Sequence, residues 1–159
     1  MTRFVCLLGV LVLLVVSACA HTRRSSGAEG ARKAAELFHH RARWKDFGGA
    51  ALLLVPEKRA GFEEARRMLN DDRELSISDY QLDELQLSAD GLSARVLSKV
   101  GWHRLPSLSQ HDETVVTELV WRDGAWLVSR QENGPFHEEL SMPYEPPSSP
   151  APSAADAGS

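Results

Sequence analysis

The sequence predicts an α+β domain in which N-terminal helices pack on a curved, cone-like antiparallel sheet, with a disordered tail at the C-terminus. Three observations support this prediction. Apolar residues recur at helical spacing in the first half of the chain, their period changes to two after residue 73, and tight-turn sequences separate the alternating segments. Helices followed by a run of strands are typical of an α+β arrangement.

The first predicted helix begins at Ser26 and Glu29, a capping-box pair in which each side chain satisfies a free backbone N–H group. Its apolar face is formed by Ala31, Ala34, Ala35, Phe38 and Ala42 and is widened by Leu37 and Trp44. The pair Gly48-Gly49 is expected to end this helix. A short apolar turn over residues 50–55 then leads to the second helical segment.

Pro56 suits the first position of the next helix, because proline lacks the N–H group that this position leaves unused. Phe62, Ala65 and Leu69 form its apolar side, and residues 70–72 are expected to end it. These two helices and the short apolar turn between them, counted as a helical segment of its own, give three helical segments before residue 73.

Alternation of apolar residues predicts four strands after residue 73. The first strand shifts its phase between Ile77 and Leu85, which indicates a β-bulge that bends the sheet. Residues 89–91, "ADG", predict a hairpin turn. One face of the second strand carries Leu92, Ala94, Val96, Val100 and Trp102, and Pro106-Ser107 closes it. Asp123-Gly124 predicts a tight turn between the last two strands.

The N-terminus has the pattern of a secretory signal peptide. Arg3 precedes an apolar run over residues 4–16, which ends in small residues. This run is short for a membrane span, which needs about 20 apolar residues. Extending it through Ala20 reaches the lower limit, so a signal anchor that stays uncut is one alternative, and an ordinary signal peptide with a chance cysteine is another.

The segment Val16-Ser17-Ala18-Cys19 resembles the lipobox of bacterial lipoproteins. The resemblance covers this segment only, with all four positions matching. It implies that Cys19 receives a lipid, that the chain is cut before it, and that the new amino terminus is acylated, for instance by palmitate. Ala20 in place of an aspartate implies the outer membrane and a periplasmic domain. Membrane lipid held through Cys19 is thus a predicted partner.

These features divide the chain into four parts. Residues 1–18 are the predicted signal peptide, 19–27 a lipidated tether, 28–142 the α+β domain and 143–159 a tail rich in Pro, Ser and Ala that is expected to be disordered. The chain has two cysteines. Since Cys6 lies in the signal peptide and Cys19 carries lipid, no disulfide is possible in the mature protein.

The charge of the mature protein argues against nucleic acid as a partner. Removing residues 1–18 leaves 17 basic and 22 acidic side chains, a net charge of −5. A nucleic-acid-binding domain of this size is usually basic. Arg23 and Arg24 beside the predicted lipid could contact anionic headgroups, although two charges are a small signal.

Two segments, "RWKDFGG" at the end of the first helix and the last hairpin "WRDGAWLVSRQ", combine with the order of the helices and strands into a recognisable pattern. This pattern resembles the nuclear transport factor two-like fold. Ketosteroid isomerases and polyketide cyclases share this cone-shaped fold. An unrelated α+β sandwich with the same element order is the alternative. The resemblance implies a pocket between the helices and the concave sheet face, where the enzymes place a general base of tuned pKa.

Five polar side chains are candidates for such a pocket: Asp79, Tyr80, Asp83, His103 and His111. Strand alternation points His103 away from the apolar face, and His111 follows a predicted loop. No two of the five have a spacing that requires an acid–base pair. Each is therefore interpreted as a solvated strand or loop residue, and no catalytic residue is predicted.

No metal site or cofactor is predicted. His39 and His40 are neighbours on a helix and point about 100° apart, so they cannot bind one ion by themselves. The segment 39–43, "HHRAR", is interpreted as a solvated helix face. The tryptophans at 44, 102, 121 and 126 could line a ligand pocket, but aromatic residues at alternating strand positions more often pack in the core.

Two functional hypotheses follow. The first is a non-enzymatic envelope lipoprotein whose small domain binds an envelope protein or a small apolar ligand. The second is a lipid-anchored isomerase, dehydratase or cyclase that acts on an apolar carbonyl compound. The second rests on analogy of fold, which does not determine function. It requires an Asp or His buried in the cone within hydrogen-bond reach of a second polar group.

Overall fold

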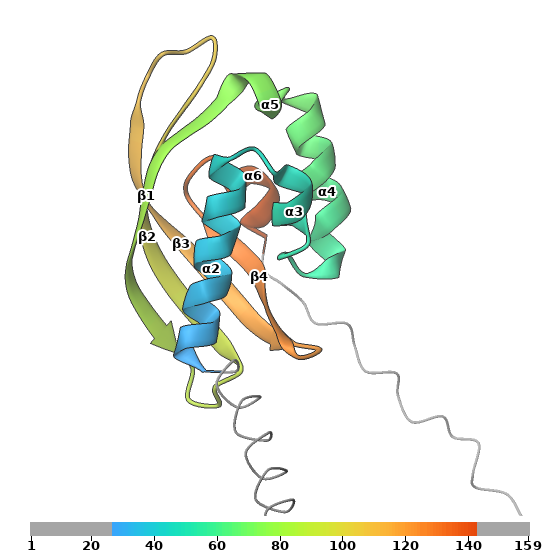
Figure 1. Cartoon of the computed structure of the whole chain (residues 1–159), viewed down its shortest axis with the longest axis vertical. Coiled ribbons are helices and arrows are strands. Elements are labelled where there is room, and N and C mark those ends of the chain that lie inside the picture. The colour runs from blue at the N-terminus through green and yellow to red at the C-terminus, as the bar shows by residue number, and fades with distance from the viewer. Residues whose placement is uncertain (1–26, 143–159) are drawn as a thin grey trace, which may run out of the picture.

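The computed structural model describes residues 27–142 of the chain. Its elements in order are α2 (Ala28–Arg43), α3 (Phe47–Ala51), α4 (Pro56–Met68), α5 (Asp71–Glu74), β1 (Leu75–Leu87), β2 (Ser93–Arg104), β3 (His111–Arg122), β4 (Ala125–Glu132) and α6 (His137–Leu140). The strands form one antiparallel sheet in the order β1-β2-β3-β4, which curves around the helices on its concave face (Figure 1). The predicted α+β fold with a curved antiparallel sheet is confirmed.

Helix α2 buries most of the face that the spacing predicts, but Leu37, Trp44 and His39 differ from the prediction. Ala31, Ala35, Phe38 and Ala42 are buried. Leu37 and Trp44, expected to widen this face, are instead exposed, and the indole of Trp44 is 71% accessible. His39 takes the place beside Phe38 and is buried, so the interpretation of residues 39–43 as a wholly solvated face is wrong. Rotation of about 100° per residue places His39 towards β1 and Leu37 away from the sheet.

The ends of α2 also differ from the prediction. Its N-cap is Gly27, with no side-chain cap, and Ser26 lies outside the described residues. The helix ends at Arg43, before Gly48-Gly49, which lie inside α3 instead. Asp46 caps α3 by accepting a hydrogen bond of 2.9 Å from the Gly49 backbone N–H group. A Cβ atom at Gly49 would lie 2.1 Å from this carboxylate, so the cap itself requires glycine.

Helix α4 begins with Pro56, as predicted. It buries Phe62 and, one helical turn later, Arg66. The helix ends at Met68, and Asn70 adopts a left-handed conformation with φ of 52°. The chain then forms one further short helical turn, α5, which the sequence does not predict. Its first residue, Asp71, is completely buried.

The predicted bend in β1 is confirmed. Its register with β2 shifts twice, between Ile77 and Asp79 and between Leu82 and Glu84. Each extra residue bends and twists the strand, and two shifts in one long strand let the sheet curve around α2. The turns at 89–91 and at Asp123-Gly124 are also confirmed, with Gly91 and Gly124 at positive φ.

A C-terminal segment closes the core from the helical side. Phe136 and Leu140, next to and within α6, are fully buried, although the sequence predicts no helix there. The Lys58 Nζ group donates to the carbonyl oxygens of Leu140 and Met142 and so fastens this segment to α4. Within residues 27–142, no helix combines the length and the apolar composition that crossing a membrane requires.

Candidate functional site

The space between the helices and the concave sheet face is filled by aromatic rings. Phe38 from α2, Phe62 from α4 and Phe136 contact one another at centroid distances of 6.2, 6.0 and 5.3 Å. Phe47 adds a further edge contact with Phe136 at 6.3 Å. All four side chains are buried. The interior in which the enzyme hypothesis requires a reaction pocket is thus occupied by packed side chains at this point.

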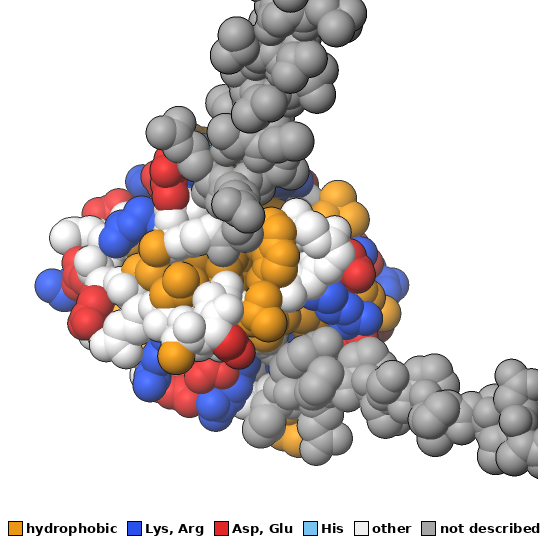
Figure 2. Space-filling model, turned by 90° about the horizontal axis from the view of Figure 1, so that it is seen from below, with side chains coloured by type: hydrophobic (Ala, Val, Ile, Leu, Met, Phe, Trp, Pro, Cys, Tyr) orange, Lys and Arg blue, Asp and Glu red, His pale blue; other side chains and the backbone are white. Residues whose placement is uncertain are grey.

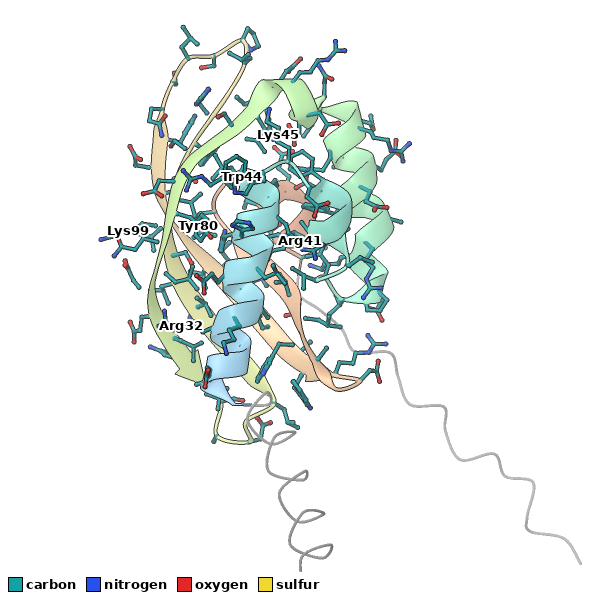
Figure 3. All side chains as sticks on the ribbon, viewed as in Figure 1. Arg32, Arg41, Trp44, Lys45, Tyr80 and Lys99 are labelled. Carbon is teal, nitrogen blue, oxygen red and sulfur yellow. The ribbon has the colours of Figure 1, made fainter. Side chains whose placement is uncertain are left out.

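His39 is the histidine that the fold buries in this interior. Its ring stacks on that of Tyr80, with centroids 5.6 Å apart, and meets the edge of Phe38 (Figure 3 shows Tyr80 on β1 next to α2). Its Nε2 atom has no hydrogen-bond partner among the described residues. Burial lowers the pKa of His39 to about 4, so the imidazole is neutral at pH 7. Burial also raises the pKa of Tyr80.

The enzyme hypothesis requires a second polar group within reach of a buried Asp or His in the cone. Among residues 27–142, His39 has aromatic neighbours and makes no hydrogen bond through Nε2. A buried hydrogen bond does lie further along the concave face, where Gln131 Nε2 donates to Thr117 Oγ1 at 3.2 Å. Neither of these two side chains is an acid or a base. The required pair is therefore not formed by His39. The buried Asp71 does have polar partners, but these are the guanidinium groups of Arg66 and Arg104, which form an ion-pair cluster with it and are not a second acid or base.

The remaining candidates lie apart from one another. Asp79 is exposed and pairs with Arg43 at 3.4 Å, while Asp83 pairs with Lys99 at 3.5 Å. His103 on β2 is half-buried opposite Ser76. The interpretation of Asp79 and Asp83 as surface strand residues agrees with these positions.

The sequence predicts a loop position for His111, whereas in the structure it is the first residue of β3. Its ring stacks on that of Trp102 with centroids 4.2 Å apart and planes 11° apart. Its Nδ1 atom lies 3.7 Å from the Glu113 carboxylate. The cross-strand pairing of Trp102 with His111 produces this stack, and the sequence contains no local signal for it.

The tryptophans have four different environments. Trp126 is buried in the core, as predicted. Trp121 is partly buried and its ring packs against that of Trp126. Trp44 is exposed, and Trp102 lines a pocket. The described residues contain no group of three or more His, Cys, Asp or Glu side chains placed to hold a metal ion.

A cluster of four charged side chains, the Arg66 cluster, lies at the end of the domain where α2 terminates; Arg66 and Asp71 are buried, and Arg104 and Glu139 are partly buried. Asp71 is its centre: Arg104 donates to both carboxylate oxygens, at 3.0 and 3.2 Å, and Arg66 Nη1 lies 2.7 Å from Oδ2. Arg66 also pairs with Glu139. Sequence reasoning missed the cluster, since it assigned only Phe62, Ala65 and Leu69 to the packed side of α4. The available signal was that Arg66 follows the buried Phe62 by four residues.

Burial is the main influence on the ionisation of this cluster. It lowers the pKa of Arg66 to about 10, and Asp71 acts against this shift. Burial raises the pKa of the Asp71 carboxyl, while the guanidinium groups of Arg66 and Arg104 act in the opposite direction. The Arg66 guanidinium also lies over the rings of Phe62 and Phe136, at 5.0 and 4.7 Å from their centroids. Within the described residues, Arg66 Nε, Arg66 Nη1 and Glu139 Oε2 are buried without a hydrogen-bond partner, so ion pairing and the two aromatic faces compensate the charge of Arg66 only in part.

A pocket of about 320 Å³ opens beside this cluster and is called the distal pocket here. Its wall includes Trp102, Arg104, His111, Glu113, His137 and Glu138. These residues come from the end of β2, the start of β3 and the segment around α6. Figure 1 shows that this end of the sheet lies opposite the end at which α2 begins.

The distal pocket has a negative balance of charge. Two arginines, Arg66 and Arg104, face four carboxylates in the cluster and the pocket wall: Asp71, Glu113, Glu138 and Glu139. The histidines of the wall, His111 and His137, add positive charge only when they are protonated. With neutral histidines the pocket therefore suits a ligand that carries a positive charge.

The predicted lipidation site lies elsewhere in the chain. Cys19 and the residues before it, Val16, Ser17 and Ala18, lie outside the described residues, and so does the predicted tail over residues 143–159. The lipobox hence remains a prediction from sequence.

No protein-family model matches this chain, and no curated protein matches it in sequence. Solved structures do resemble it. A SEC-C motif-containing protein from Rhodopseudomonas palustris aligns with a TM-score of 0.51 at 13% identity, covering 70% of this chain and 81% of its own. A protein described as a polyketide cyclase from Xanthomonas campestris gives a TM-score of 0.49 at 14% identity, covering 71% and 96% of the two chains.

The intermembrane-space region of the chloroplast protein ARC6 aligns with a TM-score of 0.47 at 14% identity, covering 66% of this chain and 94% of its own. At sequence identities of 13–14%, structural similarity supports the fold and nothing about function. Only the first of the three TM-scores is above 0.5. The chain is accordingly an α+β domain with a fold of known kind, and its function must be argued from its own residues.

Proposed function

We propose that this protein is a bacterial lipoprotein, anchored in the outer membrane through Cys19, whose domain is a non-catalytic binding module facing the periplasm. The lipobox residues Val16 to Cys19 support the anchor. The packed aromatic interior and the absence of a polar partner on His39 Nε2 among residues 27–142 support a binding role over catalysis.

The distal pocket is the proposed binding site, and its ligand is a small polar molecule with an amine or guanidinium group. The observation that carries this proposal is the excess of carboxylates over arginines around the pocket. Carboxylates are favourable partners for an organic cation, because hydrogen bonds between opposite charges are the strong ones. The sequence predicts an apolar ligand in the cone, whereas the charged wall favours a cationic one.

The position of the pocket fits the proposed anchor. The lipid would hold the chain at the end where α2 begins, and the distal pocket lies at the opposite end of the sheet (Figure 1). A ligand in the periplasm would then reach the pocket without passing between the domain and the membrane.

The ligand proposal is tested by titrating the mature protein with arginine, lysine and putrescine, and with glutamate as an anionic control, by isothermal calorimetry. We expect binding of at least one cation and none of glutamate. Glu138→Gln should weaken the binding at least about tenfold, because a charged hydrogen bond contributes about 1.5–3 kcal/mol and 1.4 kcal/mol is a factor of ten. Glu64→Gln on the exposed side of α4 is the matched control and should have no effect.

Equal binding of glutamate and the cations, or equal affinity of Glu138→Gln and the natural protein, would refute the ligand proposal. The anchor is tested separately by the intact mass of the chain extracted from its native membranes. Loss of residues 1–18 together with the mass of several acyl chains is expected. A full-length mass without lipid would mean that the segment over residues 4–20 stays uncut.

A further inference from the structure

The end of the domain at which α2 begins carries an exposed apolar surface, called the proximal patch and formed by Leu87, Leu92 and Trp121. The backbone carbonyl oxygen of Leu92 accepts a hydrogen bond of 2.8 Å from the Trp121 backbone N–H group. Leu87 on β1 pairs with Ala94 on β2, which follows Leu92 by two residues. Strand pairing puts Leu87 and Trp121 on the same sheet face as the buried Ala94, Leu119 and Trp126, and Leu92 lies just before β2 at the edge of this face. The accessible fractions of Leu87 and Leu92 are 39% and 54%.

The proximal patch is continuous with the core. The ring of Trp121 meets that of the buried Trp126 at 5.6 Å in a T-shaped contact, and Trp121 itself is only partly buried. Figure 2, which views this end of the molecule directly, shows hydrophobic side chains gathered in the middle of the face. Two exposed leucines beside a half-buried tryptophan form contiguous apolar surface, and contiguous apolar surface is typical of sites that meet a protein or a membrane.

The length of the tether limits what can lie opposite this patch. Eight residues separate Cys19 from Ala28, the first residue of α2. A fully extended chain spans at most about 3.6 Å per residue, so the start of α2 stays within roughly 30 Å of a lipidated Cys19. The turns at 89–91 and at Asp123-Gly124 lie at this same end (Figure 1).

Basic residues occur in the tether sequence and on the first turns of α2. Arg23 and Arg24 precede α2 in the sequence. Arg32, on the first turns of α2, is exposed and makes no ion pair with any residue of the described part of the chain (Figure 3). Basic side chains close to a bilayer are attracted to anionic headgroups, each by about 1 kcal/mol. Asp90 and Asp123 at the two turns are exposed and can remain in water.

We infer that the proximal patch lies in the interface of the lipid bilayer, so that the domain rests on the membrane with a fixed orientation and points its distal pocket outwards. This inference depends on the proposed lipid anchor at Cys19. The short tether brings the patch to the membrane, and leucine and tryptophan side chains are the types that favour the headgroup boundary. The bilayer covers apolar surface that the fold itself leaves exposed.

The experiment uses single thiols in the mature lipidated protein. Cys6 is removed with residues 1–18 and the Cys19 thiol carries lipid, so an introduced cysteine is the only free one. Leu92→Cys tests the proximal patch and Leu87→Cys tests it a second time. Leu108→Cys is the matched control, because Leu108 is 82% exposed on the loop between β2 and β3 at the opposite end.

Each variant is labelled with an environment-sensitive fluorophore and reconstituted into vesicles of phosphatidylethanolamine and phosphatidylglycerol that contain spin-labelled lipid. We expect a blue shift and strong quenching of the probes at positions 92 and 87, and neither effect at position 108. Unquenched probes at 92 and 87 on protein that floats with the vesicles would overturn the orientation and leave the anchor intact.

Two further results would also overturn the inference, and they differ from each other. Protein that does not float with the vesicles would show that the anchor itself is absent. A blue shift at position 92 without lipid quenching, growing with the protein-to-lipid ratio, would show that a second copy of the chain covers the patch.

Discussion

The imidazole of His39 is buried without a hydrogen bond from Nε2 to any described residue, at a position where an apolar side chain would fit the same neighbours. Its surroundings are the rings of Phe38 and Tyr80. A buried polar atom without a partner costs free energy, and a charged one costs more. The folded protein therefore holds this side chain in its neutral form, and its pKa of about 4 follows from that burial.

This burial makes stability depend on pH. The pKa of His39 is about 4 in the folded protein and 6.5 for the unperturbed side chain. The unfolded chain thus binds more protons between these two values, and the free energy of unfolding falls as the pH falls from about 6.5 to 4, by about 3 kcal/mol in total. His39→Leu should remove this part of the slope and should also raise stability at pH 5.

Urea unfolding at pH 7, 6, 5 and 4.5 measures the effect. His40→Leu is the matched control, because His40 is exposed on the same helix. The prediction is wrong if the free energy of unfolding of His39→Leu has the same pH dependence as that of the natural protein. The sequence could not predict the burial of His39, since His39-His40 is a pair in which only the rotation of α2 relative to β1 decides which member turns inwards.

At the level of helices and strands, local patterns predict what depends on neighbours in sequence. The helix start at Pro56, the bulge in β1 and the turn at Asp123-Gly124 are confirmed because each acts through local backbone geometry, and the structure adds a second register shift in β1. The short helices α5 and α6 are missed, since a four-residue helix carries no periodicity. Both are held by contacts with distant parts of the chain, since Asp71 pairs with Arg104 and the carbonyl oxygen of Leu140 accepts from Lys58.

Two glycines test this distinction between local and tertiary control. Gly61 lies exposed inside α4, and a Cβ atom there would meet nothing within 4 Å. Gly61→Ala should raise the free energy of unfolding by about 0.5–1 kcal/mol, because alanine is the better helix former. Gly134, at φ of 78°, would place a Cβ atom 2.7 Å from Val115 Cγ2. Gly134→Ala should lower it by about 1–3 kcal/mol.

Thermal and urea unfolding of the two alanine variants, measured side by side, give both values. The sign is the decisive observation, as both changes add one methyl group to the chain. A stabilising Gly134→Ala would show that the segment between β4 and α6 relaxes and does not hold its left-handed conformation against Val115.

For the molecule as a whole, the Arg66 cluster joins elements that are remote in sequence. Arg66 belongs to α4, Asp71 to α5, Arg104 to β2 and Glu139 to α6, so its ion pairs connect the helices, the sheet and the closing segment. The aromatic contacts of Arg66 with Phe62 and Phe136 extend it into the core. The same cluster lies beside the distal pocket, since Arg104 and Glu139 also line that pocket.

Removing the central carboxylate should affect the whole domain. Asp71→Asn leaves Arg66 and Arg104 without their shared counter-charge, and breaking a buried ion pair by removing one partner costs about 3–5 kcal/mol. Asp72→Asn is the matched control, because its exposed side chain lies one residue away and its backbone carbonyl keeps the hydrogen bond from Lys45. Urea unfolding followed by circular dichroism measures both variants.

A second variant separates the loss of charge balance from the loss of packing. Arg66→Met in the background of Asp71→Asn removes one of the two uncompensated guanidinium groups and retains a long apolar side chain against Phe62 and Phe136. It should recover part of the stability that Asp71→Asn loses. If Asp71→Asn costs no more than Asp72→Asn, the carboxylate does not hold these four elements together, and aromatic packing alone closes the domain.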